Sequence, residues 1–269
     1  MRSVINLFDL TKRNVLITGG AGHIGFRLAQ ALIELGANVF LLDRNQSTLD
    51  DAVEKLLQNA SGSQRVSGYE VDLSKPNSID RFLLQMNEEL QVLDVLIQCA
   101  AFVGTDKLEG WGVPFKQQSV ETWRQCVDVN MTAPFQIVKG LMPLLEESSQ
   151  PSIIHFSSIY GQVGPNLDLY EGTELGNPAA YAASKAGLAQ LTRWLATATP
   201  SHFRVNTVTP GGIERGQPQD FMARYNKKVP MGRMGREEDL VGVVCLLASD
   251  AGAYINGQDI AVDGGWTAW

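Results

Sequence analysis

Tyr181 and Lys185 are spaced so that they could move a proton together. The stretch around them is rich in Ala and Leu, and Asn177 followed by Pro178 predicts that a helix begins there, with Asn177 as N-cap. Residues four apart lie one turn up the same helix face. A free phenol has a pKa of about 10, and a nearby positive charge lowers that value towards neutrality, where acid/base catalysis works best. The same spacing also occurs where a packed ring lies beside a solvated amine, so the interpretation depends on what surrounds the helix.

A glycine-rich turn between a short strand and a helix predicts a nucleotide site upstream. Residues 14–18 form an apolar run, residues 19–25 read Gly-Gly-Ala-Gly-His-Ile-Gly, and an amphipathic pattern continues to Leu35. Such glycines let the backbone approach a pyrophosphate, which the N-terminus of the following helix attracts. A glycine cluster can also be a plain turn, but the flanking strand and helix favour the nucleotide site. The residues expected to contact the cofactor here are Gly19, Gly22, His23, Ile24 and Gly25.

Asp43, which ends the apolar run 38–42, predicts which cofactor is bound. It lies roughly twenty residues beyond the glycine turn, where an acidic side chain accepts hydrogen bonds from the adenosine ribose hydroxyls. A carboxylate there would repel a 2′-phosphate, so NAD is preferred to NADP. Arg44 follows directly and weakens that preference. The alternative is that Asp43 only caps the next helix.

The remaining sequence alternates between short apolar runs and amphipathic stretches. Strands are expected over residues 65–71, 93–98, 152–157, 203–208 and 258–262, and helices over 47–60, 77–90, 119–147 and 237–248. This alternation predicts an α/β fold, a single-domain Rossmann-type doubly wound parallel sheet of about seven strands flanked by helices. The ligand crevice is then expected at the carboxyl ends of the strands. We predict one domain, 1–269, with a Gly-rich lid around 211–236 that closes over cofactor and substrate.

The composition fits one globular domain and excludes several kinds of partner. The 269 residues are 44% hydrophobic and 19% charged, with a net charge of −7 and no cluster of Lys and Arg, so nucleic acid is not an expected partner. No apolar run is long enough to span a bilayer, and residues 1–10 lack the features of a signal peptide, so a cytoplasmic protein without a membrane partner is expected. Cys99, Cys126 and Cys245 are expected to be buried, reduced thiols, and no metal site is predicted.

Two further segments are expected near the active site. Ser158 follows the apolar run 152–157, where an α/β protein builds its active site, although a serine there can equally be a plain strand-end cap. The acidic segment 162–177 is either a wall of the substrate pocket or a solvated loop, and both interpretations remain open. His155 is interpreted as a core histidine rather than a base.

These segments together resemble the short-chain dehydrogenase/reductase family over essentially the whole chain. The matching segments are residues 18–25, Asp72-Leu73, Asn130, Ser157-Ser158, Tyr181-x-x-x-Lys185, Pro210-Gly211 and residues 262–265. By resemblance, Tyr181 is the acid/base and Ser158 polarises the substrate oxygen. Lys185 would hold the nicotinamide ribose and lower the tyrosine pKa, and Asn130 would support a proton-relay water. The resemblance adds further residues to those expected to contact the cofactor: Asp72, Leu73, Ala100, Tyr181, Lys185, Pro210, Gly211 and Ile213.

The sequence departs from the family's usual pattern in two places. His23 replaces the middle glycine in the Gly-x-x-x-Gly-x-Gly pattern of the short members, so Gly19, Gly22 and Gly25 follow the Gly-x-x-Gly-x-x-Gly spacing of longer members. Residues 98–101 read Gln-Cys-Ala-Ala where Asn-Asn-Ala-Gly is usual. The second change puts some sheet-stabilising contacts in doubt, but not the chemistry.

The resemblance implies an oxidoreductase that transfers a hydride between NAD(H) and a secondary alcohol or ketone of a small molecule. A narrower resemblance, carried by residues 170–173, Asn177-Pro178, 228–234 and 262–269, is to a bacterial branch associated with legionaminic-type sugar biosynthesis and flagellin modification, and implies a sugar or sugar-phosphate substrate. The alternatives are a 3-oxoacyl-thioester reductase that uses NADPH and a catalytically idle nucleotide-binding module. A homo-oligomer, either a tetramer or a dimer, is also implied.

Overall fold

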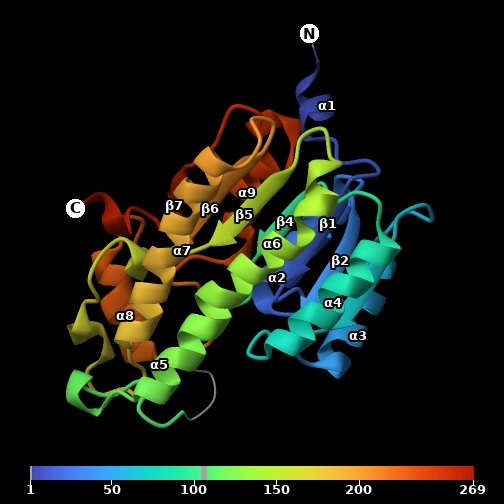
Figure 1. The fold of residues 1–269 in the computed structure, drawn as a ribbon. Coiled ribbons are helices and arrows are strands. Elements are labelled where there is room, and N and C mark those ends of the chain that lie inside the picture. The colour runs from blue at the N-terminus through green and yellow to red at the C-terminus, as the bar shows by residue number, and fades with distance from the viewer. Residues whose placement is uncertain (1, 104–107) are drawn as a thin grey trace.

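Seven parallel strands form one sheet in the computed structural model, which describes residues 2–103 and 108–269 (Figure 1). The strand order is β3-β2-β1-β4-β5-β6-β7. The strands are β1 (Asn14–Thr18), β2 (Asn38–Asp43), β3 (Val66–Glu70), β4 (Val95–Gln98), β5 (Ser152–Phe156), β6 (Arg204–Pro210) and β7 (Asp259–Val262). The predicted α/β fold with a doubly wound parallel sheet is confirmed.

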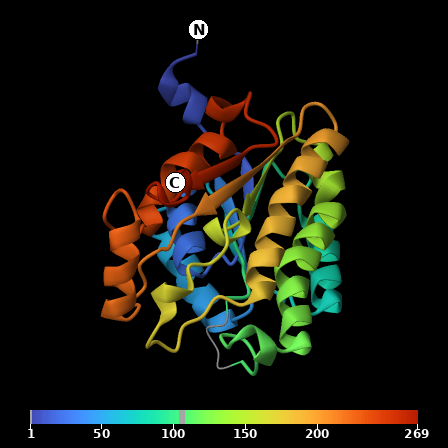
Figure 2. The same ribbon diagram turned by 90° about the vertical axis from the view of Figure 1, so that its left-hand side faces the viewer.

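Helices pack on both faces of the sheet (Figure 2). One face is covered by α2 (His23–Glu34), α3 (Gln46–Leu57) and α9 (Val241–Ala248), and the other by α4 (Pro76–Glu89), α6 (Ala133–Glu146) and α7 (Ala179–Ala198). The other helices are α1 (Val4–Phe8), α5 (Val120–Val127) and α8 (Gln219–Lys228). Short helical turns are η1 (Phe115–Gln117), η3 (Ile159–Gly161), η4 (Leu167–Tyr170), η5 (Glu237–Leu240), η6 (Asp250–Gly252) and η7 (Trp266–Ala268).

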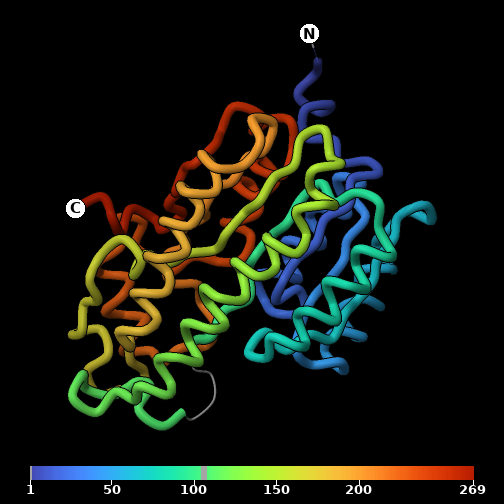
Figure 3. Tube along the Cα trace, viewed as in Figure 1, coloured from blue at the N-terminus to red at the C-terminus, as the bar shows by residue number. Residues whose placement is uncertain are grey.

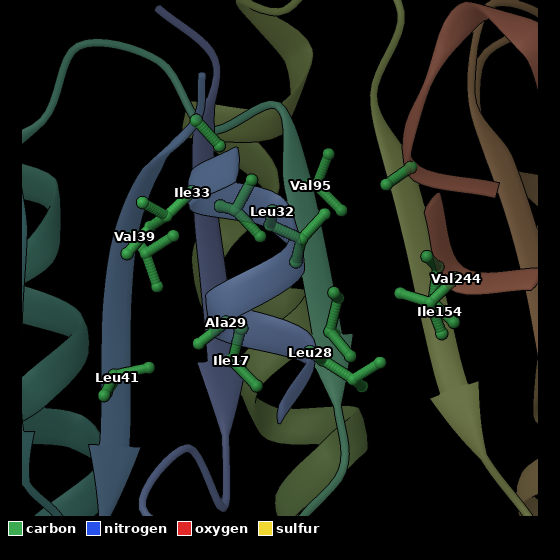
Figure 4. Packing of buried hydrophobic residues seen from close by; sticks show 14 of the residues in the cluster. Ile17, Leu28, Ala29, Leu32, Ile33, Val39, Leu41, Val95, Ile154 and Val244 are labelled. Atoms are coloured by element: carbon green, nitrogen blue, oxygen red, sulfur yellow. The ribbon is translucent and has the colours of Figure 1, made fainter. Parts of the chain in front are cut away.

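The layer between α2 and the sheet shows how the apolar pattern of this helix is used (Figure 4). Its inward side chains recur at helical spacing and are at most 2% exposed: Leu28, Ala29, Leu32 and Ile33. They pack in one cluster with residues of the neighbouring strands, among them Ile17, Val39 and Leu41. Burying one large aliphatic side chain contributes about 1.5–3 kcal/mol. This layer therefore holds α2, and the glycine turn at its N-terminus, firmly against the sheet.

The strand order places a crevice between β1 and β4. From these two neighbours the chain continues outwards in opposite directions, to β2 and to β5. In a doubly wound sheet this is the point where a crevice opens beyond the carboxyl ends of the strands. Segments 162–177 and 211–236 lie side by side at that end, where η4 contacts α8 (Figure 3). Both segments therefore border the place where a ligand is expected.

The helix that carries Tyr181 and Lys185 begins later than predicted. α7 starts at Ala179 with Pro178 as its N-cap, and the Asn177 side-chain oxygen has no hydrogen-bond partner, so the prediction of Asn177 as N-cap is wrong. Instead, the side-chain oxygen of Gln118 accepts a hydrogen bond from the Ala179 N–H at 3.0 Å. A residue distant in sequence thus caps the helix, which the local sequence could not indicate.

The long helix predicted over residues 119–147 is interrupted. A π-helical segment, η2 (Asp128–Thr132), separates α5 from α6. Pro134 has no N–H to donate to the Asn130 carbonyl one turn back, which favours a wider turn at this point. The N–H that follows the segment bonds to a carbonyl five residues back, as a π-turn requires. The interruption places Asn130 within the wide turn, facing α7.

Candidate active site

A cavity of about 1050 Å³ lies at the carboxyl ends of the strands. Its size is at the upper end for small-molecule sites, so it has room for a dinucleotide and a small substrate. The turn after β1, the ends of β2 to β6, α7 and the segment 211–236 all contribute to its lining. The lining includes every residue that the sequence predicts to contact the cofactor: Gly19, Gly22, His23, Ile24, Gly25, Asp43, Asp72, Leu73, Ala100, Tyr181, Lys185, Pro210, Gly211 and Ile213.

The turn after β1 fits the pyrophosphate of a dinucleotide. A Cβ on Gly25 would lie 2.2 Å from the Gly19 carbonyl oxygen, and a Cβ on Gly19 would lie 2.9 Å from the Ala100 backbone, so neither position has space for a side chain. Gly19 also has a φ of +68°, which favours glycine. Gly22, the N-cap of α2, gives no side-chain cap to the first N–H groups of the helix. These groups are available to an anion in the cavity.

Two carboxylates line the cavity where β2 and β3 end. The Asp43 carboxylate accepts hydrogen bonds from the Ala21 N–H at 3.1 Å and the Arg44 N–H at 2.8 Å, which hold it beside the glycine turn. Asp72 accepts hydrogen bonds from Ser74 and lies 3.0 Å from the Lys75 ammonium. Burial raises the pKa of Asp72, but these partners outweigh it, so its pKa is lowered overall. Asp43 retains lone pairs that could accept hydrogen bonds from ribose hydroxyls.

Tyr181, Lys185 and Ser158 meet on the wall of the cavity beside β5. The Lys185 ammonium lies 5.8 Å from the centroid of the Tyr181 ring, so the expected placement on one helix face is confirmed. This ammonium is buried and donates a hydrogen bond to the Phe156 carbonyl at 2.7 Å. A hydrogen bond with Ser158 lowers the pKa of the Tyr181 phenol, and the Ser158 hydroxyl also accepts from the Tyr160 N–H at 3.3 Å.

Burial controls the protonation of this group of residues. Burial raises the pKa of Tyr181 overall, against the lowering effects of the Ser158 hydrogen bond and the Arg215 charge. Burial also lowers the pKa of Lys185 to about 8. The pKa of Tyr181 is therefore not near neutrality in the protein by itself, and the lowering effect of Lys185 on it stays a prediction. The cost of placing a phenolate in a buried site exceeds the stabilisation that the nearby charges provide.

Asn130 lies behind the cavity wall rather than on it. Its side chain is 1% exposed and does not line the cavity. The amide oxygen accepts a hydrogen bond from the Phe102 N–H at 2.7 Å, and the amide nitrogen donates to the Ser184 hydroxyl at 3.1 Å. The Ser184 hydroxyl in turn donates to the Tyr181 carbonyl at 2.9 Å. The Asn130 side chain thus ties the π-turn to the backbone of the helix that carries Tyr181.

Four aromatic side chains form one wall of the cavity, and the sequence did not single them out as site residues. They are Tyr160, Tyr170, Phe221 and Tyr225. The hydroxyls of Tyr160 and Tyr170 are 2.7 Å apart, and Tyr225 stacks on the buried Trp266 at 4.6 Å. Of the two interpretations of segment 162–177, the pocket wall is the one that fits, because Tyr170 comes from this segment. The proximity of Tyr160 to Ser158 in sequence was a usable signal, and Phe221 and Tyr225 belong to the segment 211–236 that was predicted to close over the ligands.

Of the remaining candidate residues, His155, Cys126 and Cys245 do not line the cavity, whereas Cys99 does. His155 is fully buried with Nδ1 2.7 Å from the Thr192 hydroxyl, and burial lowers its pKa to about 3, so it is a neutral core histidine. All three cysteines are free, but Cys99 is only half-buried, which corrects its expected burial. Within residues 2–103 and 108–269, no group of acidic, His or Cys side chains is arranged to hold a metal, and no helix is long and apolar enough to cross a membrane.

The fold and this site together define a class of protein. A glycine turn at the switch point of a doubly wound sheet suits a nicotinamide dinucleotide, and a phenol, an ammonium and a hydroxyl lie in the same cavity. The class is that of NAD(P)-dependent oxidoreductases that act on CH–OH groups. Residues 19–267 match the model of a family described as enoyl-(acyl carrier protein) reductase. The chain belongs to the short-chain dehydrogenase/reductase family.

Relatives within this family act on different substrates. The rhamnolipids biosynthesis 3-oxoacyl-[acyl-carrier-protein] reductase of Pseudomonas aeruginosa is 32% identical, over 96% of this chain and 98% of that protein. The 5-keto-D-gluconate 5-reductase of Escherichia coli is 28% identical, over 97% of each. A solved structure, a short chain dehydrogenase from Leptospira borgpetersenii with bound NAD+, is 31% identical with a TM-score of 0.82, covering 99% of this chain and 96% of the other.

Proposed function

We propose that this protein transfers a hydride between NAD(H) and a secondary alcohol or ketone of a polar, sugar-like substrate, with Tyr181 as the acid/base. The observation that carries this proposal is the half-buried Tyr181 phenol, which lines the cavity together with Ser158 and with Lys185, whose ammonium lies 5.8 Å from the ring centroid. No other described residue of the cavity combines a proton that can be transferred with a neighbouring hydroxyl and a neighbouring cation in this way.

Each residue has a separate task in the proposed reaction. A bound nicotinamide supplies or accepts the hydride. Tyr181 gives a proton to the substrate oxygen during reduction and removes it during oxidation. Ser158 donates a hydrogen bond to the same oxygen as negative charge develops on it, and Lys185 favours the phenolate and holds the nicotinamide ribose. Asn130 acts as a positioning residue through Ser184.

The proposed substrate class rests on the cavity wall. Tyr160 and Tyr170 present hydroxyls beside aromatic surfaces, a combination that suits a polyhydroxy ring or chain, and one relative reduces 5-keto-D-gluconate. The second candidate is a 3-oxoacyl-thioester reductase that uses NADPH, favoured by the relative with that activity. An idle nucleotide-binding module would not need the Ser158, Tyr181 and Lys185 set. The narrower legionaminic branch has no support among the names of the relatives, so the proposal stops at a sugar-like substrate.

Turnover on a matched panel distinguishes the two candidates. NADH or NADPH consumption is followed with ketoses, keto-aldonates and phosphorylated ketoses on one side, and with 3-oxoacyl thioesters on the other. The proposed function predicts the higher kcat/KM for a carbohydrate. A higher kcat/KM for the thioesters would transfer the assignment to the acyl reductase.

The NAD preference is tested at Asp43. Asp43→Ser removes the carboxylate that would repel a 2′-phosphate and accept bonds from the ribose, so we expect NADPH to bind about tenfold tighter and NADH about tenfold weaker. Fluorescence titration of both cofactors measures this change. Asp51→Ser, which removes an exposed carboxylate that does not line the cavity, is the matched control. Weaker binding of both cofactors would indicate only damage to the glycine turn and would contradict the selector role.

We further propose that the protein forms a homo-oligomer through the layer of α5, α6 and α7. Large apolar side chains remain exposed there: Trp123 (41%), Phe135 (49%) and Trp194 (60%). A second copy of the same surface would cover them. Light scattering is expected to give a dimer or tetramer mass, which Trp123→Glu reduces. Leu57→Glu, at an exposed leucine on the opposite layer, should leave the mass unchanged, and a monomeric wild type would contradict the proposal.

A further inference from the structure

Arg215 is a cation in the cavity whose charge the fold does not use. It follows β6 in the segment 211–236, is exposed, and belongs to the cavity lining. Its backbone N–H donates to Gln217, but within residues 2–103 and 108–269 its guanidinium has no hydrogen bond or ion pair. Two other cations of the same lining are engaged: Lys185 on a backbone carbonyl and Lys75 on Asp72.

The charge of this guanidinium acts on two other residues of the cavity lining. Its charge lowers the pKa of the Tyr181 phenol and, together with Lys185, that of the Cys99 thiol, although burial raises both overall. Tyr181 comes from α7, and Cys99 follows β4 at the switch point of the sheet. Arg215 is thus an exposed side chain of the cavity lining whose charge still acts on residues from two different elements.

The chemistry of this group selects its ligand. A guanidinium is planar, always charged and able to form two parallel hydrogen bonds to a carboxylate or phosphate. The acidic neighbour in sequence, Glu214, does not neutralise the guanidinium. The hydrogen bond that Glu214 makes runs from its backbone N–H to the Gly235 carbonyl, and among the described residues its carboxylate has no ion pair with Arg215.

We propose that Arg215 binds an anionic oxygen of a molecule held in the cavity, either a phosphate or carboxylate of the substrate or the pyrophosphate of the dinucleotide. The inference rests on the proposed function, because it assigns Arg215 to the same site and adds an anion to the polar, sugar-like ligand class. If the anion belongs to the substrate, neutral ketoses are poorer ligands than their phosphorylated or carboxylated counterparts.

Two binding measurements on Arg215→Gln identify the source of the anion. The first is the Kd of NADH; the second is the Kd of inorganic phosphate for enzyme saturated with NAD+, by calorimetry. Loss of a charge-assisted pair is expected to weaken the affected ligand by about ten- to a hundredfold. Arg215→Lys, which keeps the charge without the planar fork, is expected to fall between wild type and Arg215→Gln. Lys227→Gln removes an exposed cation of α8 that does not line the cavity, and should change neither value.

The two dissociation constants distinguish the two possible sources of the anion. A weaker NADH complex assigns Arg215 to the pyrophosphate, and weaker phosphate binding with unchanged NADH affinity assigns it to a substrate anion. If neither Kd changes by more than about twofold, or if Lys227→Gln reproduces the loss, the proposal is overturned. Neither measurement needs turnover, so a protein that binds phosphate through Arg215 but reduces no ketone would contradict the proposed function alone.

Discussion

Replacing Tyr181 with phenylalanine is expected to lower turnover by about 10² to 10⁴-fold, the usual size of acid/base assistance. The ring and its packing remain, and only the hydroxyl that exchanges a proton with the substrate is lost. NADH should therefore bind nearly as in wild type, which a fluorescence titration verifies. Turnover close to that of wild type would remove Tyr181 from the proposed chemistry.

The pH dependence gives this variant a second readout. Because burial raises the pKa of Tyr181, the phenol is protonated at neutral pH. Oxidation needs the phenolate, so kcat/KM for the alcohol should rise with pH, whereas reduction uses the phenol as acid and should fall as pH rises through the tyrosine pKa. Tyr181→Phe should remove both slopes. Tyr254→Phe, at a fully exposed tyrosine, is the matched control and should keep them.

The sheet and the cofactor side of the site could be predicted because their signals are local. The apolar run of β1, the glycines that follow it and Asp43 at the end of β2 each report on a few adjacent residues. Parallel strands then bring their carboxyl ends to one edge, so residues as distant as Gly19 and Ala100 meet without further information. Local spacing on a helix likewise sufficed to bring Tyr181 and Lys185 together.

The features that could not be predicted from the sequence depend on contacts between distant segments of the chain. The start of α7 is set by Gln118, far upstream, and not by the adjacent Asn177. The direction of the Tyr181 pKa shift follows from how deeply the phenol is buried, which no spacing reveals. Arg215 could not be separated from a solvated arginine until the segment 211–236 was folded over the cavity.

Replacing Gly25 with alanine is expected to disrupt the glycine turn itself. The added Cβ would lie 2.2 Å from the Gly19 carbonyl oxygen and 2.9 Å from two further backbone atoms, none of which can rotate away. Overpacking of this kind costs about 1–3 kcal/mol, and each kcal/mol lowers Tm by about 2–4 °C in a chain of this size. The turn must shift to relieve the contact, so NADH affinity should fall as well. Thermal melting and NADH titration measure the two effects.

Gly22 and Gly62 provide graded controls for the same substitution. A Cβ on Gly22 would meet only the Gly19 carbonyl oxygen at 3.2 Å, and one on Gly62 would meet nothing within 4 Å, so the losses should decrease from Gly25 to Gly22 to Gly62. The His23 side chain is 71% exposed, with its Nδ1 3.9 Å from the Glu237 carboxylate. The close contacts thus fall at Gly19 and Gly25 and not at position 23. Equal stability and equal NADH affinity in Gly25→Ala and Gly62→Ala would contradict this account, because the turn would then have space that its geometry denies.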